Sequence, residues 1–173
     1  TFAYNQKNFM TKTVRDAAPG GIQAVEEFEC DRLVNPLARI DAAGTRTQTV
    51  YDAVYRPIFT VIDPAGLNIV SQTVYNSLSQ VVKRIDPAGN ETLYEYDQLG
   101  RLTKETRPDT GTSLYAYDKN GNLVKKTDKI NSAGQTMITV YTYDAANRRV
   151  QEVQDASVDG NAGLDITTTY LYD

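Results

Sequence analysis

The stretch YEYDQLGRLTKETRPDTGTSLYAYD at residues 94–118 decides the fold. It opens with aromatic residues alternating with a charged one, which places Tyr94 and Tyr96 on the same face of a strand. Residues 97–100 (Asp-Gln-Leu-Gly) carry Asp and Gly at the first and last positions, as a type I turn favours. The chain then returns, turns again at Pro108–Gly111 and enters another strand. One such cycle is marginal in water by itself, so it requires neighbouring cycles.

The same cycle recurs along the chain. A tyrosine followed by Asp or Asn marks most cycles, and Cys30 takes the tyrosine position in one of them. The marked positions are Tyr4, Cys30, Tyr51, Tyr75, Tyr96, Tyr117, Tyr143 and Tyr172, at intervals of 26, 21, 24, 21, 21, 26 and 29 residues. We therefore predict one array over residues 1–173 with about seven repeats, at 5–30, 31–51, 52–75, 76–96, 97–117, 118–143 and 144–173.

A second aromatic residue stands two positions before the marked one in six cycles, while Thr49 and Thr73 are the exceptions. Stacked cycles would place these rings in rows on one face of a sheet. The longer turn of each cycle ends in glycine, which tolerates positive φ. These turns are expected at 16–21, 41–44, 63–66, 86–89, 108–111, 128–134 and 155–163.

The pattern predicts an all-β fold, a repetitive antiparallel β-hairpin strip that buries its apolar surface only between neighbouring repeats. A compact sandwich of about fourteen short strands is the competing architecture. We favour the strip, because sandwich strands do not usually carry one recurring Tyr-Asp turn at nearly fixed spacing. The apolar residues do not recur with the 3.6-residue period of a helix, because Gly, Pro and Asp interrupt the chain. Residues 22–32 are the one segment whose secondary structure is doubtful.

Composition limits the function. The formal net charge is -4, with Lys and Arg scattered along the chain, which argues against a nucleic-acid surface. Histidine is absent, so the chain alone cannot build Ser-His-Asp or Cys-His systems or His-containing metal sites. No apolar run reaches the length of a membrane span. We expect no catalytic, cofactor or metal site, and we interpret Cys30 as a small buried apolar residue and not as a reactive thiol.

The motif Tyr96-Asp97-Gln98-Leu99-Gly100-Arg101-Leu102 and its echo from Tyr117 to Leu123 resemble the YD repeat of the Rhs family, which is shared with the C component of bacterial toxin complexes and with teneurins. The resemblance implies a β-sheet strip that spirals into a hollow shell around a toxic domain, or an extracellular scaffold. The repeat-defining structural residues would be Tyr51, Asp52, Tyr75, Asn76, Tyr94, Tyr96, Asp97, Gly100, Arg101, Leu102, Tyr115, Tyr117, Asp118, Gly121, Tyr141, Tyr143, Asp144, Tyr172 and Asp173.

The expected function is therefore a structural shell or scaffold segment of a secreted bacterial protein, and not an enzyme. Expected partners are neighbouring repeats of a larger chain, identical chains meeting edge to edge, and an enclosed toxin domain. The alternative is an extracellular recognition module that binds glycan or a cell-surface partner through the longer turns. Both ends of the chain look like cuts through a longer array.

Two further patterns resemble sites but are better explained by the repeat. Family shells can end in an Asp-dependent self-cleavage region with paired Asp-Pro-x-Gly motifs, which Asp63–Gly66 and Asp86–Gly89 superficially resemble. Both occupy the turn position of their cycle. Residues 155–165 are rich in oxygen ligands but lack the acidic spacing and the terminal Glu of a calcium loop. We interpret them as a long hairpin loop.

Overall fold

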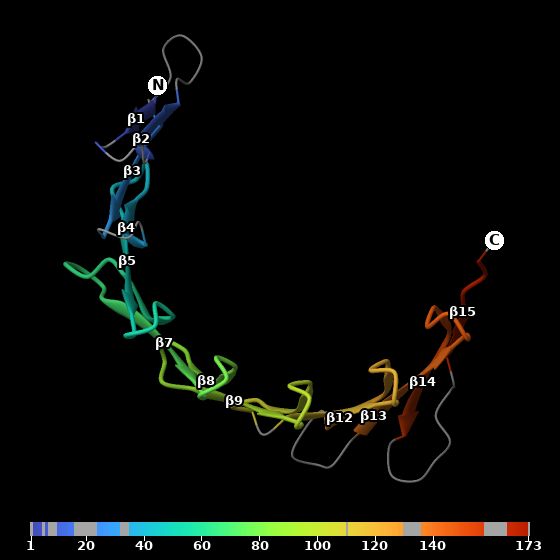
Figure 1. Ribbon diagram of the computed structural model, residues 1–173. Helices are drawn as coiled ribbons and strands as arrows, with labels where there is room; N and C mark the ends of the chain where they lie inside the picture. Colours follow the sequence, from blue (N-terminus) through green and yellow to red (C-terminus); the bar gives the residue numbers. More distant parts are fainter. Residues whose placement is uncertain are drawn as a thin grey trace. The chain divides into compact units, whose positions relative to one another are not determined.

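The computed structural model describes residues 2–4, 6, 10–15, 24–31, 35–109, 111–129, 136–157 and 166–172. This described part contains strands and turns but no helix, and hence no helix that could cross a membrane. The strands, labelled in Figure 1 where there is room, are β1 (Phe2–Tyr4), β2 (Met10–Arg15), β3 (Ala24–Cys30), β4 (Pro36–Ile40), β5 (Arg46–Tyr51), β6 (Pro57–Ile62), β7 (Ile69–Tyr75), β8 (Val81–Ile85), β9 (Glu91–Tyr96), β10 (Leu102–Thr106), β11 (Thr112–Tyr117), β12 (Leu123–Lys129), β13 (Thr136–Tyr143), β14 (Arg149–Ser157) and β15 (Ile166–Thr169).

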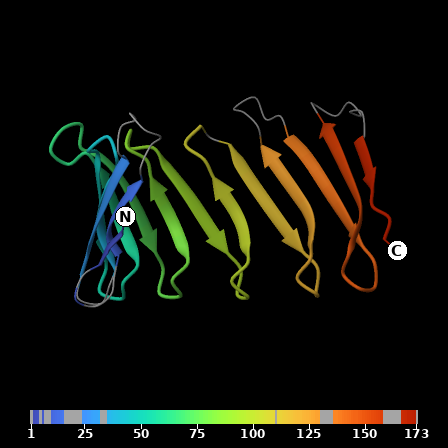
Figure 2. The same ribbon diagram turned by 90° about the horizontal axis from the view of Figure 1, so that it is seen from above.

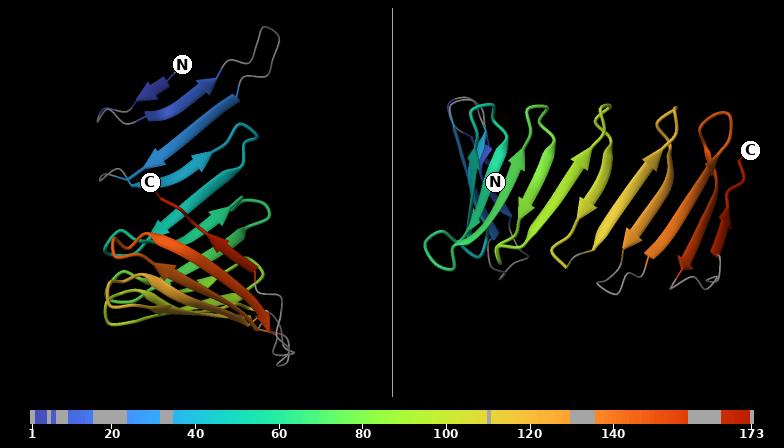
Figure 3. Two further views of the ribbon diagram at one scale, coloured as in Figure 1. Left: turned by 90° about the vertical axis from the view of Figure 1, so that its right-hand side faces the viewer. Right: turned by 90° about the horizontal axis from the view of Figure 1, so that it is seen from below.

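The chain divides into two compact units. The first comprises Thr1–Ser79 with Arg84–Gly89, the second Gln80–Lys83 with Asn90–Asp173, so that β8 has residues in both. In the first unit β1 to β7 follow one another in chain order, and in the second β9 to β15 do the same, each strand antiparallel to the next. Within each unit the strands lie side by side in a single layer (Figures 2 and 3). The predicted antiparallel hairpin strip is confirmed, and the doubtful segment contains the strand β3.

The two ends of the strands differ in pairing. Where β1, β3, β5, β9, β11 and β13 run into the turn after a marked residue, the register shifts by a bulge beside that residue, as between Val50 and Tyr51 and between Ala116 and Tyr117. The pairings across the opposite turns, such as β4 with β5 and β10 with β11, carry no such shift. A bulge adds one residue to one strand and increases its local twist. We call the row of strand ends at the Tyr-Asp turns, where the marked residues lie, the bulged edge of the sheet. We call the row of opposite strand ends, where the pairing carries no bulge, the regular edge.

The glycines of the regular edge do two different jobs. Gly44 and Gly89 have φ of +82° and +83°, as their turns were predicted to require. Gly66 has no positive φ. Asp63 and Asn68 adopt φ of +51° and +50° in its place, and a Cβ at Gly66 would require the Asp63 carboxylate to move.

Two aspartates that were expected to open turns lie inside strands. Asp128 was predicted to open a turn, but it lies inside β12. Asp155 likewise lies inside β14. In both places the cross-strand pairing of the hairpin continues past an aspartate that the local pattern treats as a turn residue. The prediction that Asp128 and Asp155 open turns was therefore wrong.

Little of the chain is buried, because each unit has only one layer. Exposure alternates along β9, where Glu91, Leu93 and Glu95 are exposed and the residues between them, including Tyr94 and Tyr96, are half-buried. Among the residues whose burial the structure describes, Ala38 is the single fully buried apolar one. The sheet is therefore held by contacts between neighbouring strands and not by a core between layers.

Candidate functional site

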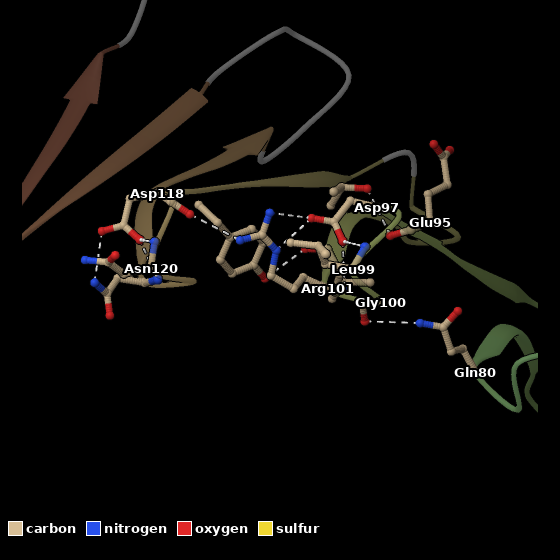
Figure 4. A network of polar contacts seen from close by, with 12 residues as sticks. Gln80, Glu95, Asp97, Leu99, Gly100, Arg101, Asp118 and Asn120 are labelled. Carbon is tan, nitrogen blue, oxygen red and sulfur yellow. Dashed lines mark hydrogen bonds and ion pairs between the residues drawn. The ribbon is translucent and has the colours of Figure 1, made fainter. Parts of the chain in front are cut away.

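The bulged edge is built from one repeated five-residue turn, which we call the Tyr-Asp turn. Figure 4 shows it at residues 97–101. The N–H of Gly100 donates to the carbonyl of Asp97 at 3.0 Å, and the N–H of Asp97 donates to the carbonyl of Arg101 at 2.9 Å. The Asp97 side chain closes the turn from inside, because its Oδ1 accepts from the N–H groups of Leu99 and Arg101, both at 2.9 Å. Equivalent side-chain bonds occur at Asp52, Asp118 and Asp144.

The fourth residue of the turn adopts the left-handed conformation. Glycine takes this position at Gly100 and Gly121, with φ of +80° and +89°. Tyr55, Ser79 and Asn147 take the same position with φ between 60° and 63°. The turn therefore forms without glycine, at the cost of some backbone strain.

Arginine at the fifth position joins one repeat to the next. Arg101 donates through Nε to Asp97 Oδ2 at 2.7 Å, and its Cζ lies 4.7 Å from the ring centroid of Tyr117, the marked tyrosine of the following repeat. Its Nη1 also donates to the carbonyl of Asp118 at 3.2 Å (Figure 4). The guanidinium is thus held by a carboxylate, a ring face and a carbonyl at once.

The carboxylate and ring contacts of this bridge occur twice more. Arg56 binds Asp52, lies 4.8 Å from the ring of Tyr75 and donates to the carbonyl of Asn76 at 3.0 Å. Arg148 binds Asp144 and lies 4.8 Å from the ring of Tyr172. Three of the marked tyrosines are therefore covered by an arginine from the preceding turn.

Each marked tyrosine also reaches back through its hydroxyl. Tyr117 donates to the carbonyl of Leu102 at 2.9 Å, the residue that directly follows the preceding Tyr-Asp turn. The bond recurs at every marked tyrosine from Tyr51 onward, with lengths of 2.7 to 3.1 Å. The acceptors are the carbonyls of Pro36, Pro57, Val81, Leu102, Leu123 and Arg149.

The aspartates of these turns are saturated with donors. A backbone N–H from Arg101, together with its guanidinium, holds the pKa of Asp97 below its ordinary value. The backbone N–H and the guanidinium of Arg148 do the same for Asp144, and Asn122 does so for Asp118 through its amide side chain and backbone. Carboxylates that stay ionised and fully bonded are structural acceptors and are poor general acids or bases near neutral pH.

A second group of polar residues lies in and beside β10 to β12. It is away from the bulged edge, on the face of the sheet that carries the tyrosines. Ser113 is 1% and Asp128 7% exposed. The Ser113 hydroxyl donates to Asp128 Oδ1 at 2.5 Å and accepts from Arg107 Nη1 at 2.9 Å. Lys126 lies 2.8 Å from Asp128 Oδ2. We call these four residues the buried polar group. Its members bond to one another, and Ser113 and Asp128 are shielded from solvent.

The structure places the predicted residues as follows. The marked tyrosines and the aspartates that follow them lie at the bulged edge. Tyr94, Tyr115 and Tyr141 lie further into their strands, on the same face. The carbonyl of Leu102 accepts the hydroxyl bond of Tyr117 at the bulged edge. Asp173 and most of residues 155–165 lie outside the described residues. Cys30, expected to be buried, is half-buried at the end of β3. Asp63 and Asp86 both lie in turns of the regular edge.

Sequence reasoning missed several contributors. It did not single out Arg56 and Arg148, although their place five residues into a Tyr-Asp turn matches that of Arg101. It also missed the buried polar group, which depends on the register that brings Ser113 opposite Asp128. No group of three or more potential metal ligands occurs among the described residues.

Comparison with known proteins identifies the repeat. Residues 75–112 and 117–157 match the family model described as RHS Repeat, which confirms the resemblance found in the sequence. No curated protein matches the chain in sequence.

Solved structures match over most of the chain. A crystal structure of TcdB2-TccC3 covers 99% of this chain and 11% of its own, with a TM-score of 0.78 and 18% identity. A crystal structure of TcdB2-TccC3-Cdc42 covers 87% and 9%, with a TM-score of 0.71 and 20% identity. The Photorhabdus luminescens Tc holotoxin pore covers 85% and 10%, with a TM-score of 0.57 and 16% identity. These likenesses establish the fold, and the chain spans about a tenth of the length of the chains it matches.

Proposed function

Because residues 75–112 and 117–157 are RHS repeats, and the chain has the fold of the matched Tc structures, we propose that it is a wall segment of a secreted protein that encloses or presents a toxic domain. The chain is a structural repeat segment whose immediate partners are its own neighbouring repeats. One of the matched structures is a Tc holotoxin pore, and the proposal extends that setting to this chain.

The observation that carries this proposal is the continuity of the bulged edge. Each marked tyrosine from Tyr51 onward is bonded to the preceding repeat, and arginine bridges add a second link at three of these positions. Such links hold successive repeats in register, and the turn aspartates serve as hydrogen-bond acceptors within them. A wall requires this property, and a site of turnover does not.

The chemistry of the two faces supports the same role. The face opposite the tyrosines carries exposed ion pairs, such as Arg46 with Glu29 and Lys104 with Glu95, beside exposed Leu93 and Leu114. The tyrosine face is more enclosed and carries the buried polar group. A sheet with two different faces can separate an interior from an exterior with one layer of strands.

The test is protease protection in the full-length protein from which this chain derives. A domain enclosed by the wall should resist digestion until denaturant opens the wall, and Arg101→Gln with Arg148→Gln should lower the denaturant concentration at which protection is lost. Glu95→Gln is the matched control, because its ion pair is exposed and belongs to no bridge. Digestion of the domain at the rate of the isolated domain would contradict encapsulation, and glycan-array binding by the native chain would favour the recognition alternative.

A further inference from the structure

Three asparagine side chains join two successive Tyr-Asp turns of the second unit. Asn147, in the turn at residues 144–148, accepts at its Oδ1 from Nδ2 of Asn120 at 3.0 Å and from Nδ2 of Asn122 at 2.8 Å. Asn122 also donates through Nδ2 to Asp118 Oδ2 at 2.9 Å. We call Asn120, Asn122 and Asn147 the asparagine link.

The link depends on the amide of Asn120 acting as a donor. An amide can present either its oxygen or its NH2 group, whereas an ionised carboxylate presents oxygen alone. A carboxylate at position 120 would therefore place a second acceptor against the Oδ1 of Asn147. If Asn147 turned its amide over, its NH2 group would face the NH2 group of Asn122, whose orientation is set by its bond to Asp118. No orientation of the Asn147 amide would then suit both neighbours.

Asn120 is also the asparagine whose sequence context most favours loss of the side-chain amide. It is the one asparagine of the sequence that is followed by glycine, and Gly121 has no Cβ to shield its nitrogen or restrict its backbone. Both residues are exposed, and Figure 4 shows Asn120 on the turn that Asp118 begins. The N–H of Gly121 donates to the carbonyl of Asp118 at 3.2 Å, compared with 3.0 Å for the equivalent bond in the turn at residues 97–101.

We propose that Asn120 is a modification site, at which the side-chain amide is lost to attack by the neighbouring backbone, and that this loss loosens the asparagine link. The nitrogen of Gly121 forms a bond to Cγ of Asn120, the bond between Cγ and Nδ2 breaks, and the proton of the Gly121 N–H leaves with Nδ2 as ammonia. Water then opens the five-membered imide. Hydrolysis of the new bond gives aspartate at position 120, and hydrolysis of the original peptide bond gives isoaspartate.

Both products weaken the link, and the link in turn opposes their formation. Either product places a carboxylate where the link needs a donor. Isoaspartate also adds one main-chain atom to a turn that the N–H of Asp118 closes by donating to the carbonyl of Asn122 at 3.0 Å. While Nδ2 of Asn120 stays bonded to Asn147, its side chain is restrained, so this bond must open before the imide can form. The junction therefore has a finite chemical lifetime that its own hydrogen bond lengthens.

The experiment follows the full-length protein that contains this chain during incubation at mildly alkaline and at mildly acidic pH. Peptides spanning residues 118–125 should gain about 1 Da, faster at alkaline pH because the attacking nitrogen must lose its proton. Fragmentation should place the gain on Asn120, while Asn122, which is followed by Leu123, is the internal control. Asn120→Gln is the matched variant and should remain unmodified, because the longer side chain would have to close a larger ring.

A second variant tests the restraint. Asn147→Gly removes the acceptor but suits the turn, because this position has φ of 60° and is glycine in the turn at residues 97–101. It should accelerate the mass gain at Asn120 at least about threefold, as expected for the loss of one hydrogen bond.

The consequence for the junction is measured by hydrogen exchange on a partly modified sample. The modified and unmodified peptides of residues 118–125 separate by chromatography, and the modified form should exchange at least about fivefold faster. Peptides covering residues 97–101 should not change. Absence of the gain, a gain on Asn122, no acceleration in Asn147→Gly, or equal exchange of the two forms would each overturn the proposal. None of these results bears on the wall function, because the Tyr143 hydroxyl bond to the Leu123 carbonyl also joins these repeats.

Discussion

Replacing Asp128 with Asn should destabilise β11 and β12 far more than an equivalent change at an exposed ion pair. Asp128 is 7% exposed, accepts the Ser113 hydroxyl at 2.5 Å and pairs with Lys126 at 2.8 Å. A hydrogen bond to a charged group contributes about 1.5 to 3 kcal/mol. Lys126 remains one-third exposed and is screened by water, so we expect a total loss of about 2 kcal/mol.

The matched control is Glu95→Gln. The ion pair of Glu95 with Lys104 is 2.7 Å long, close to the 2.8 Å of the Asp128–Lys126 pair, but the Glu95 side chain is 61% exposed. Exposed pairs contribute about 0.2 to 1 kcal/mol, so this variant should lose at most about 0.5 kcal/mol. Native-state hydrogen exchange of the β11 and β12 amides reads the difference locally. A loss of about 2 kcal/mol accelerates exchange roughly 30-fold, and the control should change it by less than about threefold.

The pH dependence of the same variant tests the charge itself. Burial raises the pKa of Asp128, but hydrogen bonds from Lys126 and Ser113 and the charges of Lys126 and Arg107 outweigh it, and the pKa lies below its ordinary value. Its stabilising contribution is therefore present above the unfolded-state pKa, about 3.9, and is lost as the pH falls through the folded-state value. The exchange difference between wild type and Asp128→Asn should be constant from pH 7 to 5 and shrink below about pH 4. A difference no larger than that of Glu95→Gln, or one that persists unchanged at acid pH, would refute the reasoning.

Three other outcomes follow from the turns and tyrosines. Tyr117→Phe should lower the free energy of unfolding by about 1 kcal/mol in urea titrations, since the hydroxyl bond to the Leu102 carbonyl is lost while the ring under Arg101 remains. Tyr55→Gly should raise the urea midpoint, because it relieves about 1 kcal/mol of left-handed strain at φ 63°. Gly89→Ala should lower the midpoint by a similar amount, because φ is +83° there and the space around the Cβ is open. Midpoint shifts of the same sign in the two variants would contradict the strain argument. Burial raises the pKa values of Tyr51, Tyr115, Tyr117 and Tyr141. Their contribution to the free energy of unfolding should therefore be fully present below about pH 10 and should fall as the pH rises through the folded-state pKa values. Tyrosinate absorbance at 295 nm and the β circular dichroism signal should change together.

Local chemistry was enough to predict the Tyr-Asp turns. Asp97 and Gly100 act within five residues of chain, and the hydrogen bonds that they make are those that their types favour in any turn. Alternation along the strand was equally local, and it placed Tyr94 and Tyr96 on one face. The strip followed because the unit repeats.

What sequence reasoning missed depends on register. Ser113 and Asp128 are 15 residues apart, and they meet only because β11 and β12 pair without a shift until they reach the bulge between Ala116 and Tyr117. Asp128 resembles a turn residue to any local rule, since Asp and the downstream glycine suit a turn. The pairing of β12 with β13 carries the strand past it. Cross-strand partners of this kind follow from pairing geometry and not from composition.

The fifth residue of the Tyr-Asp turn reveals a longer period than the repeat itself. From residue 31 onward this position reads Asn35, Arg56, Gln80, Arg101, Asn122 and Arg148, so arginine and an amide side chain alternate. The amides make shorter links. Gln80 donates to the carbonyl of Gly100 at 3.1 Å, and Asn122 donates to Asn147 Oδ1 at 2.8 Å.

Because links between neighbouring repeats add almost independently in a one-dimensional array, alternate junctions should differ in strength. The junctions at Arg56 and Arg101 combine a carboxylate, a ring and a carbonyl. The described links at the Gln80 and Asn122 junctions include the tyrosine hydroxyl bond and a neutral hydrogen bond from the amide. We therefore expect stability to be organised in pairs of repeats joined by arginine, with an amide junction between pairs.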